Sequence, residues 1–509
     1  MVEDEAQGVA ERERAERQAP PEERLRGTDD VGMGHERGPL TIDPDHHPDT
    51  ALHVPFAPFR SRAARGRPGP QEESEMPMPA LTRADNAGQG AVAETGGSAM
   101  DRQPGSALAA PVAGPPAAPA TIRPASRTLN VTSSAVREIL KITQRPDVIS
   151  LAGGLPAPET FPVDTLRDAF DAVLREAGPA ALQYSTTEGE PGLRAWIAER
   201  ETARGVPTSP DEVLVTASSQ QGLDLVAKAF VEPGEPILVE SPTYLGAIQA
   251  FSVFEPVPRE LPTDEDGVVP AALDADLARG ARFLYVMPSF QNPTGRTLTA
   301  ARRATLAAAA AGHDLWLVED DPYGELWYES PPPPSLRAWA ADRTIRIVSF
   351  SKVLAPGLRL GYVVAPRDAL DLLVRLKQAT DLHTSTLVQR AALRALSGGL
   401  MERHLPAVRA VYARQCGAML DALAASMPAS VTWTHPAGGM FVWATLPEGL
   451  DAAALLARAI ERRVAFVPGE AFYASRPMRN TMRLSFATVA PERIAEAVAV
   501  LGELVREMC

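Results

Sequence analysis

Residues 345–361 read IRIVSFSKVLAPGLRLG. The β-branched residues at the start of this stretch predict a strand, Ile345 to Phe350, and Lys352 lies just beyond its end. Four similar apolar runs precede it, separated by stretches rich in Ala, Leu and Arg: Val213 to Thr216, Ile237 to Glu240, Phe283 to Met287 and Leu315 to Glu319. Such alternation predicts βαβ units. We therefore expect an α/β fold with a mostly parallel central sheet and helices on both of its faces.

The sequence pattern changes after about Arg367. Two long helical stretches lead to three segments that resemble strands of a smaller α+β domain: Val431 to Leu446, Ala465 to Val467 and Met482 to Phe486. Upstream, residues 134–140 read SAVREIL, which predicts the capped start of a helix. We expect the folded region to span residues 126–509. Its larger domain covers about 180–370, and its smaller domain combines about 126–179 with 371–509.

Residues 1–125 differ in composition from the rest of the chain. They are rich in Pro, Gly, Ala and charged residues and show no helical or strand period. Such a segment buries too little apolar surface to offset the entropy lost on ordering, so we predict that this tail is disordered. A later start of translation, for instance at Met100, is left open. His46 and His47 are adjacent in the tail, but no further ligands lie at a useful spacing, so we expect no metal site.

The composition narrows the class of function. The chain has 509 residues, 45% of them hydrophobic, and a formal net charge of -14. Nucleic acids and anionic membranes would repel such a protein, which argues against general affinity for either and favours small-molecule chemistry. The only cysteines, Cys416 and Cys509, predict no disulfide framework. Because the chain has neither a signal-peptide pattern nor an apolar run of about 18 residues, we expect a soluble cytoplasmic protein without nucleic-acid or membrane partners.

Four polar motifs lie at or just beyond strand ends, where open α/β sheets bind their ligands. Residues 290–295 read FQNPTG, and the amide of Asn292 in this turn could donate to a phenolate oxygen. Residues 318–323 read VEDDPY and offer the carboxylate of Asp320, with Tyr323 three residues on. A buried carboxylate of this kind could keep a pyridine nitrogen protonated.

The other two motifs supply an amine, a guanidinium and a turn that binds anions. Lys352 suits an aldehyde, and Arg359 suits a phosphate. A lysine that is desolvated beside cations has a lowered pKa and can act as a nucleophile and then as a proton carrier. Residues 217–222 read ASSQQG, a strand-to-helix turn whose backbone amides would face an anion. Each motif alone also fits a surface lysine, a simple turn or a helix cap, so the combination carries the interpretation.

In this order, the four motifs resemble those of the fold type I pyridoxal-phosphate aminotransferases of class I/II, and the resemblance extends from Ser134 to the C-terminus. Residues 150–156 (SLAGGLP), 182–189 (LQYSTTEG) and 437–443 (AGGMFVW) look like the branch that contains 2-aminoadipate aminotransferase and kynurenine/aminoadipate aminotransferase. The resemblance implies pyridoxal 5'-phosphate as the cofactor and ping-pong transfer from an L-amino acid to a 2-oxo acid. The donor could be 2-aminoadipate, glutamate, or an aromatic or branched-chain amino acid.

The same resemblance implies roles for individual residues. Lys352 would hold the cofactor as a Schiff base, and Asp320 would pair with the pyridinium nitrogen. Asn292 and Tyr323 would hydrogen-bond the phenolic oxygen, and Tyr244 would stack on the ring. The phosphate would be held by four residues of the same chain: Ser219, Gln220, Ser349 and Arg359.

Other implied roles concern the partner subunit and the substrate. Tyr184 would reach the phosphate from a second subunit, which implies a homodimer. Arg483 would bind the substrate α-carboxylate bidentately beside Asn292, and Gly154 would allow close approach of the backbone to the substrate. Arg137 would approach the distal carboxylate of acidic substrates, or would be a surface residue paired with a local acid.

Two alternative functions remain. The same cofactor core serves lyases and decarboxylases, but Arg483 and residues 438–441 (GGMF) favour transamination. A transcription regulator with an aminotransferase-like domain would need a basic helix-turn-helix ahead of the core, and residues 1–120 lack paired amphipathic helices.

Overall fold

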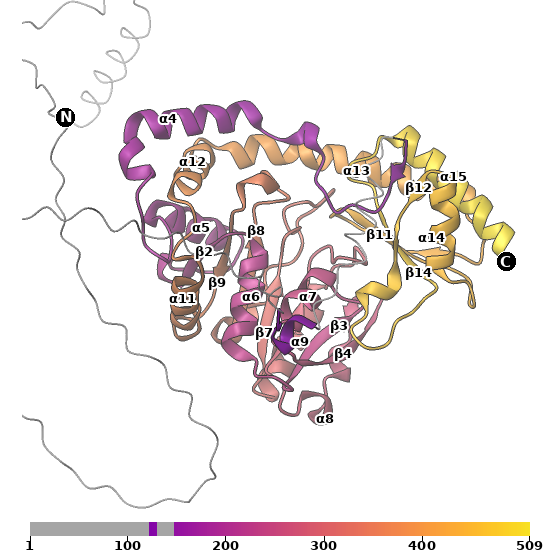
Figure 1. Cartoon of the computed structure of the whole chain (residues 1–509), viewed down its shortest axis with the longest axis horizontal. Coiled ribbons are helices and arrows are strands. Elements are labelled where there is room, and N and C mark those ends of the chain that lie inside the picture. Colours follow the sequence, from indigo (N-terminus) through magenta and orange to yellow (C-terminus); the bar gives the residue numbers. More distant parts are fainter. Residues whose placement is uncertain (1–121, 130–146) are drawn as a thin grey trace, which may run out of the picture. The chain divides into compact units, whose positions relative to one another are not determined.

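The computed structural model describes residues 122–129 and 147–509 (Figure 1). Residues 1–121, which make up almost all of the predicted tail, lie outside the described residues, and so do the predicted helix start at 134–140 and Arg137. A short helix, α2 (Ser126–Leu129), forms the first described segment.

An eight-stranded sheet forms the centre of the molecule, in the order β2-β9-β8-β7-β6-β3-β4-β5. Neighbouring strands from β8 to β4 run parallel, whereas β9 lies antiparallel between β2 and β8, and β5 forms a hairpin with β4. This confirms the predicted mostly parallel sheet. The strands are β2 (Val213–Thr216), β3 (Pro236–Ser241), β4 (Val257–Asp264), β5 (Gly267–Val268), β6 (Phe283–Val286), β7 (Trp316–Asp320), β8 (Thr344–Ser349) and β9 (Gly361–Val364).

Three of these strands, β4, β5 and β9, were not predicted from the sequence, and β5 is only two residues long. Strand β4 reads VPRELPTD, and only Leu261 among its residues is fully buried, so it has no apolar run. Strand β9 is only four residues long and follows a Pro/Gly-containing turn, so its apolar pattern is too short to stand out.

Both faces of the sheet are covered, because alternate residues of the same strand belong to different apolar cores. Leu284 and Leu317 join one cluster with Leu306 of helix α9 (Ala300–Gly312). Tyr285 and Val318 join the other, which includes residues of α6 (Ser219–Phe230). The strands therefore carry continuous apolar runs rather than alternating ones.

A smaller four-stranded antiparallel sheet has the order β10-β11-β14-β13, and β1 pairs separately with β12. Helices α13 and α15 pack against each other beside it (Figure 1). The elements are β1 (Ile149–Ser150), β10 (Thr432–Trp433), β11 (Phe441–Thr445), β12 (Val464–Ala465), β13 (Val467–Pro468), β14 (Thr481–Ser485), α13 (Leu400–Ser426), α14 (Ala452–Glu461) and α15 (Pro491–Met508).

Three helices, not the predicted two, separate the two sheets: α11 (Arg367–Asp381), α12 (Thr386–Ser397) and α13. The breaks fall at Leu382 and Gly399, which both have positive φ angles, and Ser385 then caps α12. Helix α11 packs on α6, and α12 packs on α4 (Val163–Ala181) and α5 (Pro191–Ala203). The predicted domain boundaries stay a prediction. Helices α11 and α12 pack on α6 and α5, which belong to the predicted larger domain.

The remaining helices are short: α7 (Leu245–Ser252), α8 (Ala275–Ala278) and α10 (Arg337–Ala340). Across residues 122–129 and 147–509, no helix is both long and apolar enough to span a membrane.

Candidate active site

The predicted cofactor residues meet at one edge of the large sheet. Ser219 follows β2, Tyr244 follows β3, Asp320 ends β7 and Lys352 follows β8. These four strands run in the same direction, so their carboxyl ends converge, and the connecting turns bring side chains together that are far apart in the sequence.

Lys352 lies in the turn after β8, and its Nζ donates to the carbonyl oxygen of Gly154 at 2.7 Å. Burial, together with the guanidinium groups of Arg483 and Arg359, lowers the pKa of Lys352 to about 8. A substantial fraction of this amine is therefore neutral near pH 8, as a nucleophile or a proton acceptor requires.

Asp320 is 1% exposed, and its Oδ2 accepts a hydrogen bond from the Tyr285 hydroxyl at 2.8 Å. Its other oxygen, Oδ1, is buried without a hydrogen-bond partner among the described residues. Burial raises the pKa of Asp320 to about 7. A buried acceptor that lacks its donor fits a ring N–H. Tyr285 was missed by the sequence reasoning because it lies in the middle of β6 and belongs to no motif.

Asn292 and Tyr323 are both buried and lie close together. Burial raises the pKa of Tyr323 well above its ordinary value, and the neighbouring Asn292 side chain lowers it by a smaller amount. Tyr323 thus stays protonated and can donate. Burial also raises the pKa of Tyr244, which directly precedes α7 and makes no side-chain capping hydrogen bond to it.

The turn between β2 and α6 contains the motif that was predicted to bind an anion. Ser218 has a φ of 78°, and its Oγ accepts from Arg359 Nη2 at 2.6 Å, which places the guanidinium beside the first turn of α6. Gln220 donates instead to the carbonyl of Gly246 at 3.2 Å, and the Ser349 hydroxyl accepts from the amide of Ser351 at 3.1 Å. A helix N-terminus with an adjacent guanidinium suits a phosphate.

Arg483 in β14 reaches the same edge from the smaller sheet. Its Nη1 donates to Asn292 Oδ1 at 2.9 Å and its Nη2 to the carbonyl of Ala152 at 2.6 Å. The guanidinium lies 4.3 Å from the ring centre of Phe441 and 5.0 Å from that of Phe472. Its Nε has no partner among the described residues, and burial lowers the pKa of Arg483 to about 10. A desolvated guanidinium with unused donor capacity suits a carboxylate.

Sequence reasoning quoted the motifs that contain Ala152 and Phe441 but missed their contacts with Arg483, and it missed Phe472 altogether. Tyr184 lies away from this group in its own chain: it is 78% exposed and contacts His383 edge-on at 5.8 Å.

Comparison with known proteins identifies the family. Residues 146–501 match the family model for aminotransferase class I and II. The chain belongs to this family. It is therefore a pyridoxal-phosphate-dependent transaminase, and the predicted family, activity and cofactor are confirmed.

Three relatives of this transaminase illustrate the similarity. Aromatic-amino-acid aminotransferase 1 of Thermococcus litoralis is 43% identical over 75% of this chain and 93% of its own. A 2-aminoadipate transaminase of Thermus thermophilus is 47% identical over 74% of this chain and 94% of its own. The structure of α-aminoadipate aminotransferase from Thermus thermophilus, complexed with N-(5'-phosphopyridoxyl)-L-leucine, matches with a TM-score of 0.70 and 44% identity, over 75% of this chain and 97% of that one.

Proposed function

We propose that this transaminase accepts acidic, aromatic and branched-chain L-amino acids as donors and passes their amino group to a 2-oxo acid. The observation that carries the proposal is Arg483, a buried guanidinium with unused donor capacity beside Lys352 and Asn292. It suits the α-carboxylate that all these donors share. Relatives named for aromatic amino acids and for 2-aminoadipate, and one solved with a phosphopyridoxyl-leucine, support a broad choice of side chain.

The cofactor roles follow from the unsatisfied and cationic groups. Pyridoxal phosphate supplies an aldehyde and an electron-accepting ring. Asp320 Oδ1 would accept the ring N–H, and Tyr323 and Asn292 would bind the phenolic oxygen. Tyr244 would stack on the ring. The phosphate would be held at the start of α6 by the predicted group Ser219, Gln220, Ser349 and Arg359.

Lys352 is the amine that would hold the cofactor aldehyde and move the substrate proton. Its lowered pKa keeps the amine partly neutral, so it could accept the proton at the substrate Cα. Its contact with the Gly154 carbonyl places the amine beside the backbone that Gly154 provides for the substrate. Arg137, outside the described residues, is proposed to approach the distal carboxylate of acidic donors.

We further propose a homodimer in which Tyr184 completes the phosphate site of the partner subunit. Its own chain leaves Tyr184 78% exposed, and nearby Leu182 is 71% exposed. Large exposed apolar side chains of this kind are common at interfaces between subunits.

A cytoplasmic location is also a proposal. Cys416 and Cys509 are both free, as expected in a reducing compartment. Cell fractionation with an antibody against the chain tests it, and recovery outside the cytoplasmic fraction would contradict it.

The function is tested by adding single amino acids to the protein loaded with cofactor, without an acceptor, and following conversion to the pyridoxamine form by absorbance. We expect conversion by glutamate, 2-aminoadipate, phenylalanine and leucine. Arg137→Ala should slow only the acidic donors. If no amino acid converts the cofactor, the proposed donors are wrong; if one class alone does, the proposed breadth is wrong.

A further inference from the structure

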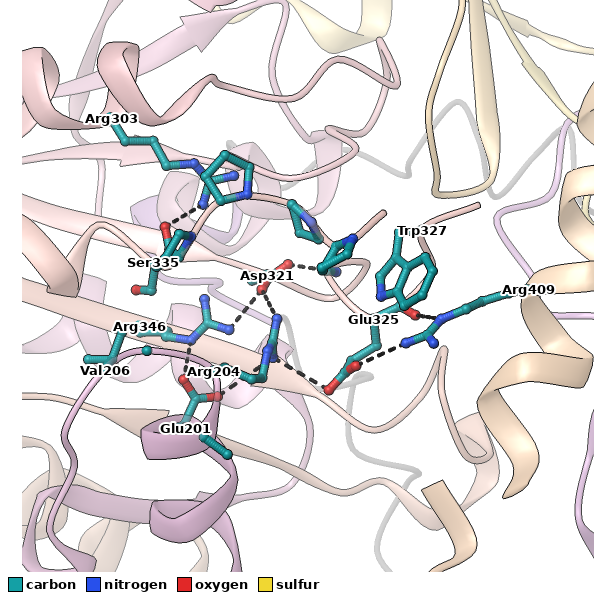
Figure 2. Close-up of a pocket in the computed structure, with 17 residues that line it drawn as sticks. Glu201, Arg204, Val206, Arg303, Asp321, Glu325, Trp327, Ser335, Arg346 and Arg409 are labelled. Carbon is teal, nitrogen blue, oxygen red and sulfur yellow. Dashed lines mark hydrogen bonds and ion pairs between the residues drawn. The ribbon is translucent and has the colours of Figure 1, made fainter. Parts of the chain in front are cut away.

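A buried network of charged side chains includes Asp321, the residue that follows Asp320 in the chain (Figure 2). At its centre is Arg346 of β8, which is 2% exposed. It donates to Glu201 at 3.0 Å and to Asp321 at 2.8 Å, and it also pairs with Glu319, its register partner on β7. One guanidinium therefore binds carboxylates from helix α5, from strand β7 and from the turn after β7.

The network is almost fully satisfied by its own members. The Tyr362 hydroxyl donates to Glu201 at 2.7 Å, and the Ser335 hydroxyl donates to Glu319 at 2.6 Å. Arg204 adds a second positive charge, 3.5 Å from Asp321. A cavity of about 590 Å³ borders these groups, and none of the residues assigned to cofactor or substrate lines it. The network therefore does not form a ligand site, and the contacts of Asp321 with the turn that follows it indicate its role.

Asp321 connects the network to the active site through the backbone. It follows Asp320, and its Oδ1 accepts the amide hydrogen of Gly324 at 2.7 Å, which closes the turn that carries Tyr323. A Cβ on Gly324 would overlap the Asp321 carboxylate, so the turn and the carboxylate fit each other closely. Arg346 therefore fixes, through one side chain, a turn with a cofactor contact on either side of Asp321.

We propose that Asp321 and Arg346 are positioning residues, which hold Asp320 and Tyr323 in place for the ring nitrogen and the phenolic oxygen of the cofactor. The inference rests on the proposed cofactor roles of Asp320 and Tyr323. It explains why a strand that is buried along its whole length carries an arginine, since a buried guanidinium is tolerated only when it is paired and hydrogen-bonded.

The charges of the pair also act on Asp320. After burial, which raises the pKa of Asp320 most, the Tyr285 hydroxyl and Arg346 lower that pKa, whereas Asp321 and Glu319 raise it. Arg346 thus offsets its two acidic neighbours. Loss of Arg346 would leave Asp320 more easily protonated and a poorer partner for a ring N–H.

The test compares Asp321→Asn with Glu212→Gln. The control removes a carboxylate from another buried arginine, Arg337, at 2.8 Å, but at the opposite end of β2 from the site. We expect both variants to lower the melting temperature of the cofactor-free protein. Only Asp321→Asn should weaken cofactor binding, by about tenfold or more, and shift the pH midpoint of the bound cofactor's absorbance. Equal binding and equal midpoints in the two variants would overturn the inference.

Two further variants keep the test decisive. Gly324→Ala displaces the Asp321 carboxylate without changing any charge, and it should also weaken cofactor binding, which covers the case that Asp321→Asn fails to fold. In an Asp320→Asn background, Asp321→Asn should shift the absorbance midpoint less than it does in the wild type, because the part of its effect that passes through Asp320 is lost and only the part that passes through Tyr323 remains. An undiminished shift there refutes the positioning role. If Asp320→Asn alone leaves cofactor binding and absorbance unchanged, the proposed role of Asp320 fails instead.

Discussion

Replacement of Arg483 by lysine tests the substrate site most directly. The native guanidinium donates to Asn292 and to the Ala152 carbonyl, and its Nε has no partner within the described part of the chain. A lysine keeps the positive charge but loses the planar pair of donors that can bind a carboxylate with two parallel hydrogen bonds. The change therefore removes geometry and not charge.

The magnitude follows from the hydrogen bonds at stake. A hydrogen bond to a charged group contributes about 1.5–3 kcal/mol, so loss of one charge-assisted bond and misplacement of the other should cost about 3–4 kcal/mol. This corresponds to a loss of roughly 10²–10³-fold in kcat/KM. Cofactor affinity should change less than kcat/KM, because Arg483 lies in the smaller sheet and contacts Ala152, two aromatic rings and only one proposed cofactor residue, Asn292.

The assay is the half-reaction, measured by stopped-flow absorbance with glutamate and with phenylalanine. A primary amine that lacks the α-carboxylate serves as the matched control substrate. Its reaction should be slow, with the same rate in the wild type and in Arg483→Lys. A loss below about threefold with both amino acids, or an equal loss with the amine, would refute the assignment of Arg483 to the α-carboxylate.

Three further predictions concern titration and assembly. The half-reaction rate should rise with pH from about 8 upward. The pKa of Lys352 is lowered to about 8 in the empty site, the bound anions raise it from there, and only the neutral amine accepts the proton. A rate that is flat from pH 7 to 9 contradicts this. Burial raises the pKa of Asp320 in the folded protein to about 7 from 3.8. Between about pH 4 and 7 the folded cofactor-free protein therefore binds one proton more than the unfolded chain, and its free energy of unfolding should fall as pH rises, by up to roughly 1.4 kcal/mol per pH unit. Asp320→Asn should flatten this slope in thermal melts, and an unchanged slope would contradict the raised pKa. Mixing the inactive Lys352→Ala variant with the weakened Tyr184→Ala variant should restore activity. One site of the mixed dimer then has both the native lysine and the native tyrosine. No gain in activity over the separate variants argues against the proposed role of Tyr184.

The sequence predicted the groups that follow strand ends, because their chemistry is concentrated in short motifs. Asp320, Asn292 and Lys352 stand beside Pro, Gly and hydroxyl residues that mark turns, so both their type and their place could be anticipated. The family resemblance then supplied their roles, which the motifs alone do not determine. Arg483, by contrast, lies within a strand, and its place in the site came only from the resemblance.

The contacts that sequence reasoning missed arise between strands. Tyr285 touches Asp320 because β6 lies beside β7, and Arg346 meets Glu319 because β7 and β8 pair in a particular register. A shift of one residue would turn Arg346 to the other face. No local pattern encodes that register, since both strands are buried on both faces.

The described site residues carry more positive than negative charge, and this imbalance shapes the chemistry. The positive charges are those of Lys352, Arg359 and Arg483, and the negative charge is that of Asp320. The two arginines help to lower the pKa of the lysine. A phosphate beside Arg359 and a substrate carboxylate beside Arg483 would offset this repulsion. Each anion that binds should therefore raise the pKa of Lys352. The lysine becomes more basic when the substrate, which carries the proton to be removed, is bound, so its pKa in the empty site can be low. Cofactor and substrate thereby set the protonation state of the residue that acts on them.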